Sequence, residues 1–578
     1  MSRDATDATT AFARTLVDEW VRGGVTDAVV APGSRSAPLA LALAGDERIR
    51  VHVHLDERSA AFMALGLGRA TGRPAVVLCT SGSAAANFHP AVTEAFHGGV
   101  PLIVATADRP PEVRGTGAAQ TIDQVGLYTT AVRWAVDVAP PEDVPGAGGA
   151  WRDLAATSVL RALGPVAGPV HLNLCFREPL VPTGAPLVDA PGRPDGAPWL
   201  DPPGAEPGLS GVAVGVLAAA CRAHQRGLIV AGWGSEVEPA TLGALAAATG
   251  WPVLADPISN LRRPPYAVDT YDALLRDPAF AEAMLPAFVL RLGALPSGKV
   301  LGQWLAGVPE VLALDPAARW IDPARTNTEV LVVPAESTVR ALVERLDDTE
   351  RDAAWGAAWR DADARARAAI DAHLDGLDVL TDPRVARDTV AAIPVGGTLI
   401  VASSMPVRDV ETFAAARDDI EFVANRGTNG IDGFTSTAVG FALGAATPTV
   451  ALVGDLCFLH DANGLLGAVE RGIDLTIVVV DNRGGAIFSF LPQADLPEHF
   501  ETLFGTPQSV DVGALASLHG ITVLEVVAPD AVGMAVRAAA DAGGVQVVVV
   551  RTDRHANVAG HRAAFAADSA ARSARSGD

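Results

Sequence analysis

Lysine is almost missing from this sequence. Of 578 residues, 44 are lysine or arginine, and only Lys299 is a lysine. Abundant alanine, glycine and arginine beside so little lysine are typical of a GC-rich coding bias, which by itself says nothing about function. The 67 Asp plus Glu residues give a net charge of −23. This charge argues against a general nucleic-acid binder or a protein held on acidic membranes, although local arginines can still bind a small anionic substrate.

Cysteine and long apolar runs are also scarce. The four cysteines (Cys79, Cys175, Cys221 and Cys457) are scattered without CxxC or metal-finger spacing, so we expect reduced, mostly buried thiols. The N-terminal residues contain no apolar signal core, and no run approaches the ~18 uninterrupted apolar residues of a membrane-spanning helix. We therefore expect a cytoplasmic protein without a membrane span.

Short apolar, β-branched runs alternate with helical stretches along the chain. Examples are DAVVA (27–31), PLIVAT (101–106), GLIVAG (227–232) and TVALVGD (449–455). Strands that alternate with helices predict parallel sheets covered on both faces. The length is too great for one core and indicates about three or four domains.

Two stretches divide these runs into three sets. One is rich in proline and glycine and is expected to be a linker, and the other is charged and helical. The predicted order is a first domain (1–185), a linker (186–208), a central domain (209–345), a helical connection (346–374), a third domain (375–565) and a disordered tail (566–578). No short tandem repeat is visible.

The strongest local signal lies in the third set. The strand TVALVG ends at Gly454-Asp455, and the strand LTIVVVD ends before Asn482. Open α/β sheets bind ligands at the carboxyl ends of their strands, where a carboxylate and an amide carbonyl are hard oxygen ligands that suit Mg²⁺. Gly484 and Gly485 let the backbone approach and offer a carbonyl to the same ion. The plainer alternative is that both segments are ordinary strand-ending turns.

The spacing from Gly454-Asp455 to Asn482 resembles the diphosphate-binding signature of thiamine diphosphate (ThDP) enzymes. The resemblance implies that Asp455, Asn482 and the Gly484 carbonyl hold Mg²⁺ (or Mn²⁺) against the cofactor diphosphate, which Gly454 and Leu456 also contact. Leu456 stands where the signature usually has a further glycine, a departure that fits one branch of the family. The implied fold is three doubly wound parallel-sheet α/β domains, which are a pyrimidine-binding, a central and a diphosphate-binding domain.

ThDP enzymes also need a carboxylate beside the aminopyrimidine ring of the cofactor. Glu57 matches the family's glutamate, and the resemblance makes it the catalytic residue, which hydrogen-bonds a ring nitrogen. Ser81 and Gly82, in the stretch CTSGSAAANFH, resemble the turn that frames the pyrimidine. Without the resemblance, Glu57 is an acid favoured by the dipole at a helix N-terminus, which is a common role.

Five stretches resemble a narrower family, the 2-succinyl-5-enolpyruvyl-6-hydroxy-3-cyclohexene-1-carboxylate (SEPHCHC) synthases of menaquinone biosynthesis. They are APGSRSAPL (31–39), TADRPPEVRGTGAAQTIDQVGLY (106–128), HLNLCFREPL (171–180), NRGTNGIDGFTSTAVG (425–440) and NRGGAIFSFLPQ (482–493). The resemblance is looser in the central domain. It implies ThDP-dependent decarboxylation of 2-oxoglutarate and 1,4-addition of the resulting succinyl carbanion to isochorismate, in a homodimer or a dimer of dimers.

Both of these substrates are dicarboxylates, so the site needs several cations. Arginine forks bind carboxylates bidentately. The motifs that match the family, together with the segment SSMPVRDVETF (403–413), supply four arginines and three polar partners, which are Arg35, Arg109, Arg408, Arg426, Ser34, Gln120 and Ser404. Ser404 begins a helix whose N-terminal N–H groups can take an anion. Each arginine taken alone is more simply explained as a surface or structural residue.

Lys299 falls on the family's lysine in the central domain, which the resemblance places on the isochorismate side. An ammonium is a compact point charge, unlike the planar guanidinium fork. A single lysine kept here, in a chain whose other cations are arginine, is the pattern expected if that ammonium is required. The alternative is chance retention.

Four apolar residues complete the predicted site. The resemblance places Ile431 beneath the bent cofactor, and Ile487, Phe488 and Leu491 along the pocket wall. A dry wall disfavours the charged carboxylate of the 2-oxo acid and so eases loss of carbon dioxide. For each of the four, ordinary core packing is the alternative.

Two rival functions remain open on the sequence. One is another ThDP-dependent 2-oxo acid decarboxylase or carboligase, such as an acetolactate-synthase-like enzyme, which is expected to have a flavin-binding middle domain or a neutral pocket. The other is a non-catalytic regulator or assembly subunit with the same fold. The arginine set argues against the first, and the presence of Glu57 and Asp455 argues against the second.

Overall fold

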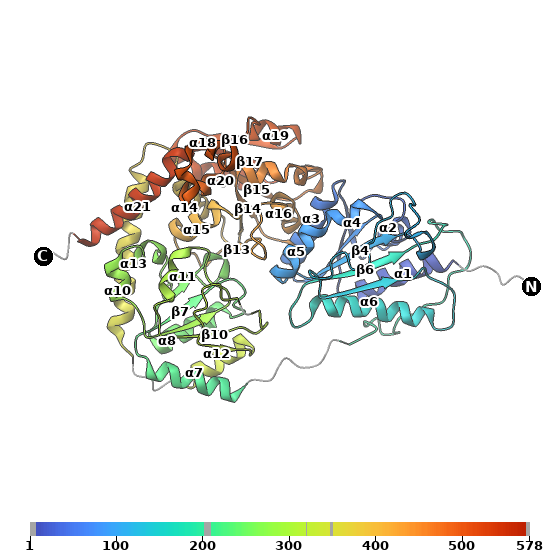
Figure 1. Ribbon diagram of the computed structural model, residues 1–578, viewed down its shortest axis with the longest axis horizontal. Coiled ribbons are helices and arrows are strands. Elements are labelled where there is room, and N and C mark those ends of the chain that lie inside the picture. The colour runs from blue at the N-terminus through green and yellow to red at the C-terminus, as the bar shows by residue number, and fades with distance from the viewer. Residues whose placement is uncertain (1–6, 202–209, 320, 347–350, 574–578) are drawn as a thin grey trace, which may run out of the picture.

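Three parallel sheets, each covered by helices, form the molecule (Figure 1). The computed structural model describes residues 7–201, 210–319, 321–346 and 351–573. Every pair of neighbouring strands in the three sheets is parallel. The predicted fold class is therefore confirmed. Within the described ranges, no helix has the length and apolar character needed to cross a membrane.

The first sheet has the strand order β2-β1-β3-β4-β6-β5. Its strands are β1 (Asp27–Val30), β2 (Arg50–Val53), β3 (Ala75–Cys79), β4 (Leu102–Asp108), β5 (Trp134–Val138) and β6 (Pro169–Cys175). Its helices are α1 (Ala8–Arg22), α2 (Ala37–Ala44), α3 (Glu57–Thr71), α4 (Ser83–Asn87), α5 (His89–Gly98) and α6 (Ala147–Leu163), with the 3₁₀ turn η1 (Pro111–Val113). Strands β3, β4 and β6 are buried along their whole length, which is why they read as continuous apolar runs.

The middle sheet has the order β11-β10-β9-β7-β8. Its strands are β7 (Gly227–Ala231), β8 (Val253–Ala255), β9 (Phe288–Leu292), β10 (Glu310–Leu314) and β11 (Glu329–Leu331). Its helices are α7 (Gly211–Ala223), α8 (Pro239–Thr249), α9 (Tyr271–Leu274), α10 (Pro278–Ala283), α11 (Lys299–Leu305) and α12 (Ala335–Glu344).

The third sheet has the order β13-β12-β14-β15-β17-β16, which repeats the order of the first sheet position by position. Its strands are β12 (Thr398–Val401), β13 (Glu421–Val423), β14 (Thr449–Gly454), β15 (Leu475–Asp481), β16 (Thr522–Val526) and β17 (Val545–Arg551). Its helices are α14 (Asp382–Ala392), α15 (Met405–Phe413), α16 (Phe434–Gly444), α17 (Asp455–His460), α18 (Pro497–Phe500), α19 (Val512–Leu518), α20 (Val532–Ala542) and α21 (Arg554–Ser573), with the short turns η3 (Ala462–Leu465) and η5 (Ala486–Phe490).

Helix α3 of the first domain packs against α16 of the third domain (Figure 1). A Cβ atom at Gly66 would lie 2.2 Å from the Thr437 carbonyl oxygen, so only glycine permits this approach. In the same way, a Cβ atom at Gly440 would lie 2.0 Å from the Met63 carbonyl oxygen. Buried residues of both sheets join into one apolar cluster across this contact. The start of α3, where Glu57 lies, is therefore fixed against the third domain.

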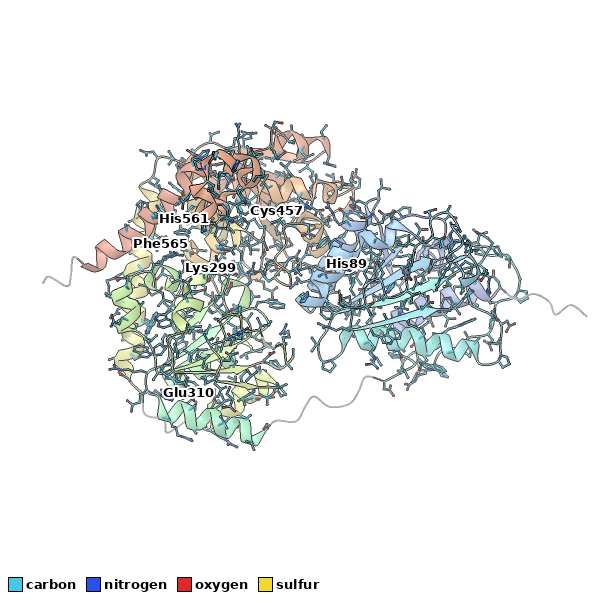
Figure 2. The ribbon with its side chains drawn as sticks, in the orientation of Figure 1. His89, Lys299, Glu310, Cys457, His561 and Phe565 are labelled. Carbon is cyan, nitrogen blue, oxygen red and sulfur yellow. The ribbon has the colours of Figure 1, made fainter. Side chains whose placement is uncertain are left out.

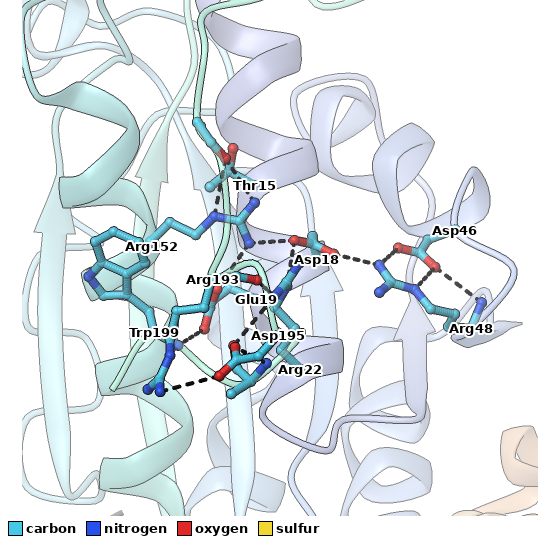
Figure 3. A network of polar contacts seen from close by, with 12 residues as sticks. Thr15, Asp18, Glu19, Arg22, Asp46, Arg48, Arg152, Arg193, Asp195 and Trp199 are labelled. Carbon is cyan, nitrogen blue, oxygen red and sulfur yellow. Dashed lines mark hydrogen bonds and ion pairs between the residues drawn. The ribbon is translucent and has the colours of Figure 1, made fainter. Parts of the chain in front are cut away.

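The first part of the predicted linker is fastened to the first domain. Residues 186–201 lie along α1 and α6, where a network of charged residues holds them (Figure 3). The buried Glu19 accepts the Trp199 backbone N–H and pairs with Arg152 at 3.0 Å. Composition alone does not reveal such anchoring, because it depends on helices far away in the chain. Linker residues 202–208 lie outside the described ranges.

Helix α13 (Ala353–Asp375) forms the connection between the middle and third domains. Its first half buries Trp355 and Trp359 among the apolar residues of the middle domain. Its second half buries Ile370 beside Phe413 of the third domain. The helix therefore braces one domain against the other. Residues 347–350 of the predicted connection are not among the described residues.

The C-terminal segment is more ordered than the sequence predicts. We expected a disordered tail from residue 566, but helix α21 continues to Ser573. Ala564 is buried, and the Phe565 ring stacks on Phe413 with centroids 6.0 Å apart, which anchors the helix just before this point. The alanine-rich residues that follow then extend it, because alanine has the highest helix propensity. Residues 574–578 of the tail fall outside the described part of the chain.

Candidate active site

Glu57 is the first residue of α3 and is half-buried. Asp56 caps the helix, since its carboxylate accepts the Ser59 backbone N–H at 3.2 Å, and it also accepts the Asn463 side-chain amide at 2.7 Å. Asn463 lies on η3 of the third domain. The cavity beside Glu57 has a volume of about 510 Å³ and is lined by Leu55, Asp56, Glu57, Arg58, Asn87, Asn463 and Leu466. Glu57 thus combines rigid support with access to an open cavity, as its predicted role beside the cofactor ring requires.

The predicted pyrimidine turn, Ser81-Gly82, follows β3. Gly82 has a φ of 87°, and its backbone N–H donates to Gln124 Oε1 at 2.8 Å. A Cβ atom at Gly82 would lie 3.4 Å from the Cα atom of Gln120, so the glycine lets the loop that contains Gln120 lie directly against the turn. Ser81 is buried, and its hydroxyl has no partner among the described residues. An unpaired buried hydroxyl fits the binding of a polar ligand group.

Arg35 and Arg109 line one cavity of about 480 Å³ in the first domain. Arg35 is 8% exposed, and its guanidinium donates to the Phe176 carbonyl at 3.0 Å and pairs with Glu178 at 3.2 Å. Burial, and then the nearby Arg109, lower the pKa of Arg35. Three arginines and two glutamates line this cavity, so its net charge favours an anionic ligand. Ser34 lies beside them in the chain and is exposed.

Asp455 is the first residue of α17, directly after β14. Its Oδ2 accepts the Gly484 backbone N–H at 2.7 Å. The side chain is 4% exposed, and burial raises the pKa of Asp455 to about 7. A cation would stabilise the ionised form of such a carboxylate. Gly454 and Leu456, on either side, are half-buried.

Asn482, directly after β15, offers the second predicted oxygen ligand for the metal ion. Its Nδ2 donates to Asp382 Oδ2 at 2.9 Å, while its Oδ1 has no partner among the described residues. A small cavity of about 20 Å³ between the ends of β14 and β15 is lined by Gly454, Asn482 and Asp382, among others. One buried carboxylate and one orphaned amide carbonyl are the donor types that Mg²⁺ takes from proteins. The residues present therefore fit the metal, and their ligand role stays a prediction.

The backbone conformation of Gly484 and its close neighbours leave no room for a side chain. Its φ is 137°, and a Cβ atom there would lie 2.1 Å from the Gly505 carbonyl oxygen. The Gly484 carbonyl accepts the Ala486 N–H at 2.9 Å, which leaves one lone pair. The predicted use of this carbonyl as a metal ligand is compatible with that geometry and is not tested by it.

Arg408 and Arg426 form a second group of cations. Ser404 stands before α15 with a φ of 74°, and the Arg408 guanidinium, one turn on, donates to its carbonyl. Burial lowers the pKa of Arg426, the nearby Asp256 raises it, and Arg408 lowers it further. The two arginines are therefore close enough to repel each other, which a dianionic ligand would relieve.

Lys299 lies in the middle domain. It is the exposed first residue of α11, and Figure 2 shows it on the side of the middle domain that faces the third domain. Two residues earlier, Ser297 donates its backbone N–H (2.9 Å) and its hydroxyl (3.1 Å) to Asp256 Oδ2. Asp256 thus fixes the segment before Lys299, and its negative charge also raises the pKa of Arg426.

The four predicted apolar residues are all half-buried. Ile487 and Phe488 lie on η5, and Leu491 follows it. The Phe488 ring packs on Phe504 with centroids 5.6 Å apart. Ile431 packs against the apolar cluster shared by the first and third domains, so core packing accounts for part of its surface. Their partial exposure leaves surface available for a pocket wall.

The chain does not bring all of these residues into one cavity. The cavity at Glu57 contains none of Asp455, Asn482 or Gly484, and the cavity at Arg35 contains neither Arg408 nor Arg426, among the described residues. The site residues fall into a first-domain half and a half built from the middle and third domains.

A potential metal cluster in the first domain is already filled by an arginine. Asp108, Asp137 and Cys175 bring one ligand atom each within 4.8 Å of one another. The Arg114 guanidinium contacts all three, at 2.8 Å from Asp108, 2.8 Å from Asp137 and 2.7 Å from the Cys175 sulfur. A guanidinium in this place excludes a cation, so the cluster is an ion-pair clamp.

Four buried or half-buried polar residues that support the site were not singled out from the sequence. They are Arg114, Gln124, Asp256 and Asp382. Arg114 and Gln124 lie inside the 106–128 motif, so their position in that motif could have identified them as candidates. Asp256 and Asp382 lie in no motif, and their contacts to site segments appear only once the chain is folded.

Family models for thiamine pyrophosphate (ThDP) enzymes match the chain in three places. The N-terminal TPP binding domain matches residues 8–127, the middle domain matches 218–401, and the C-terminal TPP binding domain matches 415–550. A solved structure with the same fold is the thiamine diphosphate-dependent 4-hydroxybenzoylformate decarboxylase of Rhodococcus jostii RHA1. It aligns with a TM-score of 0.72 over 95% of this chain and 99% of that chain at 18% identity. Fold and family models thus define the class, the ThDP enzymes.

Similarity to curated relatives identifies a particular family within this class. The SEPHCHC synthase of Thermobifida fusca is 46% identical over 565 residues, which cover 96% of this chain and 98% of the relative. The SEPHCHC synthase of Chloroflexus aurantiacus is 43% identical over 578 residues, which cover 96% of each chain. This chain belongs to the family of 2-succinyl-5-enolpyruvyl-6-hydroxy-3-cyclohexene-1-carboxylate synthases, and the resemblance seen in its motifs is confirmed.

Proposed function

We propose that this chain decarboxylates 2-oxoglutarate with ThDP and adds the resulting succinyl unit to isochorismate, forming SEPHCHC for menaquinone biosynthesis in the cytoplasm. Its match to SEPHCHC synthases over nearly the whole chain carries the proposal. The paired Arg35 and Arg109 on one cavity support it, because both substrates are dicarboxylates. The acetolactate-synthase-like alternative, with its neutral pocket, has no comparable support.

The cofactor would be held at its two ends by different parts of the fold. ThDP, when bound, supplies the electron sink for decarboxylation and carbon–carbon bond formation. Asp455, Asn482 and the Gly484 carbonyl would hold Mg²⁺ (or Mn²⁺) at the diphosphate end. At the other end, the Glu57 carboxylate would accept a hydrogen bond from a ring nitrogen, and the Ser81-Gly82 turn would frame the pyrimidine.

The remaining predicted residues would bind the substrates and exclude water. Arg35, Arg109, Arg408 and Arg426 would form bidentate pairs with carboxylates, and Lys299 would contact isochorismate. Ser34, Gln120 and Ser404 would add hydrogen bonds at the same carboxylates. Ile431, Ile487, Phe488 and Leu491 would keep the reacting carbon dry, which slows its protonation by water.

We propose further that a second copy of the chain completes each site. Glu57 and Asp455 must serve one cofactor, yet the cavity that Glu57 lines within a single chain includes neither Asp455 nor Asn482. A homodimer, or a dimer of dimers, would place the first-domain half of one chain against the third-domain half of the other. A two-fold interface would form two such sites per dimer.

The direct test is an assay with 2-oxoglutarate, isochorismate, ThDP and Mg²⁺. We expect SEPHCHC to form, and neither pyruvate as donor nor a second 2-oxo acid as acceptor to support turnover at a comparable rate. Turnover with pyruvate in place of 2-oxoglutarate would contradict the proposal and favour the acetolactate-synthase-like alternative.

The metal assignment has its own test. Asp455→Ala should abolish retention of ThDP, measured by calorimetry in the presence of Mg²⁺, because it removes the buried carboxylate of the predicted metal site. Asp541→Ala, at an exposed position of α20, is the matched control and should bind ThDP like the wild type. Wild-type affinity for ThDP in folded Asp455→Ala would rule out the assignment.

A further inference from the structure

The orientation of the Asn482 amide is set by a residue outside the predicted ligands. Asp382, the first residue of α14, is 3% exposed, and its Oδ2 accepts Asn482 Nδ2 at 2.9 Å. An ionised carboxylate can only accept hydrogen bonds, so the amide must turn its NH₂ group toward Asp382. Its carbonyl oxygen then points elsewhere, and no described residue bonds it.

Asp382 is itself held by the C-terminal region of the chain. Asn557 of α21 donates its Nδ2 to the same Oδ2 at 3.0 Å, and the Thr552 hydroxyl donates to Oδ1 at 2.5 Å. The Thr552 backbone N–H also donates to the carbonyl of Asp481, the residue before Asn482, at 3.1 Å. Three side-chain donors from two separate segments therefore converge on one buried carboxylate.

Helix α21 has a second buried contact with the site half of the third domain. His561 Nε2 lies 2.7 Å from Asp409 Oδ1, and both side chains are buried. Asp409 is on α15, next to the predicted substrate residue Arg408. The His561 Nδ1 nitrogen lies 2.9 Å from the Asn557 carbonyl, so it carries the hydrogen of that bond. Figure 2 shows His561 and Phe565 along the same helix, beside the third domain.

We infer that Asp382 is a positioning residue that aims the Asn482 carbonyl at the metal ion of the cofactor, and that Asn557 ties this function to helix α21. The inference rests on the proposed ThDP and Mg²⁺ site. Partners that orient a metal ligand from behind usually matter to metal affinity by about 10- to 100-fold when they are removed. A network with a merely structural role would instead affect folding without changing the requirement for Mg²⁺.

The experiment measures the Mg²⁺ concentration that gives half-maximal ThDP binding, by calorimetry on full-length protein, so that no turnover is needed. Asp382→Ala removes the acceptor and frees the Asn482 amide, and we expect the Mg²⁺ requirement to rise about 10- to 100-fold, with ThDP binding restored at saturating Mg²⁺. Asp382→Asn should stay close to the wild type. Its carboxamide oxygen can still face Asn482 while its NH₂ group donates to the Thr552 hydroxyl.

A matched control separates this effect from general loss of a carboxylate. Asp363 lies on α13 and contacts the middle domain, where it accepts the Thr270 backbone N–H at 2.8 Å and its hydroxyl at 2.7 Å. Asp363→Ala should leave the Mg²⁺ requirement unchanged. If Asp382→Ala does not fold, Asn557→Ala takes its place, since it removes one donor from the same Oδ2. A severalfold higher Mg²⁺ requirement is then expected.

The two possible failures are distinguishable. If the wild type shows no Mg²⁺-dependent ThDP binding, the proposed cofactor site is wrong. If the wild type shows it, and folded Asp382→Ala (or folded Asn557→Ala in its place) has the wild-type Mg²⁺ requirement, the positioning role is overturned while the cofactor site stands.

Discussion

Lys299 is the single ammonium among the predicted substrate contacts. It stands at the exposed start of α11, and Asp256 holds the segment just before it through Ser297. Asp256 also acts on Arg426 of the third domain. The buried carboxylate of Asp256 therefore positions the segment that carries the Lys299 ammonium, and it also influences an arginine of the third domain.

Lys299→Arg should raise the KM for isochorismate about tenfold and the KM for 2-oxoglutarate much less. The guanidinium keeps the charge but is larger and planar, so it cannot occupy the same point. Steady-state kinetics with each substrate varied in turn measure both constants. Arg340→Lys, on the exposed face of α12, is the control and should change neither KM. If Lys299→Arg and the wild type have equal kinetics, the ammonium is not required and the lysine at this position is explained by chance.

His171 gives a prediction about pH and stability. Its ring packs edge-on against Tyr128 with centroids 4.7 Å apart, and Nε2 lies 2.8 Å from Thr106 Oγ1. Burial lowers the pKa of His171 to about 4, and Asp137 opposes this shift. The unfolded chain takes up a proton at this residue below about pH 6.5, whereas the folded chain does not until about pH 4. The free energy of unfolding should therefore fall as the pH is lowered through this window.

The measurement is the thermal midpoint Tm at about pH 7 and about pH 5. His171→Gln should lose less Tm between the two pH values than the wild type, because the variant has no group to protonate in the unfolded state. His97→Gln, at an exposed position of α5, should keep the wild-type difference. Identical pH dependence in wild type and His171→Gln would contradict the neutral buried state.

Single residues were predictable where a short motif surrounds them. Asp455 and Asn482 each directly follow a strand, so local pattern was enough to select them as candidates, whereas Glu57 was selected by its resemblance to the family's glutamate. Asp382 was not predictable, because its contact partner Asn482 is 100 positions away in the chain and no motif contains it. Whether a half-buried residue such as Phe488 lines a pocket or a core also depends on packing that sequence does not show.

The loop between β4 and β5 is the element that places Arg109 and Gln120. It is fastened at two points. Arg114 pairs with Asp108 and Asp137, and Gln124 accepts the Gly82 N–H at 2.8 Å. The side chains of both fastening residues reach buried atoms at the carboxyl ends of the first sheet. The loop should therefore keep one conformation, which lowers the entropy lost when a substrate binds.

Arg114→Lys should raise the KM of the substrate that Arg109 and Gln120 bind, while ThDP affinity stays unchanged. A lysine keeps one charge but loses the bidentate fork that joins the two aspartates, so the loop loosens. Kinetics for both substrates, together with calorimetry of ThDP, separate the two effects. Arg161→Lys, exposed near the end of α6, serves as the control. Unchanged KM values in Arg114→Lys would show that the loop does not depend on this clamp.

The strands inside the domains were predictable from apolar runs, whereas the segments at the edges of the domains were less predictable. The buried strands of the three sheets appear in the sequence as short β-branched runs, because both of their faces are covered. The extent of α21 and the anchoring of residues 186–201 were not predictable, since each depends on a partner elsewhere, Phe413 for the helix and Glu19 for the linker.

At the scale of the whole molecule, the first and third domains are two copies of one strand order on opposite ends of the chain. The sequence shows three α/β domains but not this duplication, because strand order depends on long-range pairing and no tandem repeat marks it. The first domain holds one half of the predicted site, and the third domain holds the other together with the middle domain. Within a chain the first and third domains meet through α3 and α16, and the cavity at Glu57 includes neither Asp455 nor Asn482.

A site shared between two chains can be tested with mixed dimers. In a dimer of one Glu57→Gln chain and one Asp455→Ala chain, one shared site would carry both defects and the other would carry none. Each parent homodimer has one defect in every site and should be nearly inactive. A wild-type dimer assembled with two different affinity tags is the control for tagging and purification.

The deciding measurement is the specific rate of SEPHCHC formation by doubly tagged, purified mixed dimers. We predict about half of the wild-type rate, since one of two sites is intact. If Glu57 and Asp455 of the same chain served one cofactor, every site in the mixed dimer would have one defect. A rate no higher than that of the parent homodimers would therefore contradict the shared site.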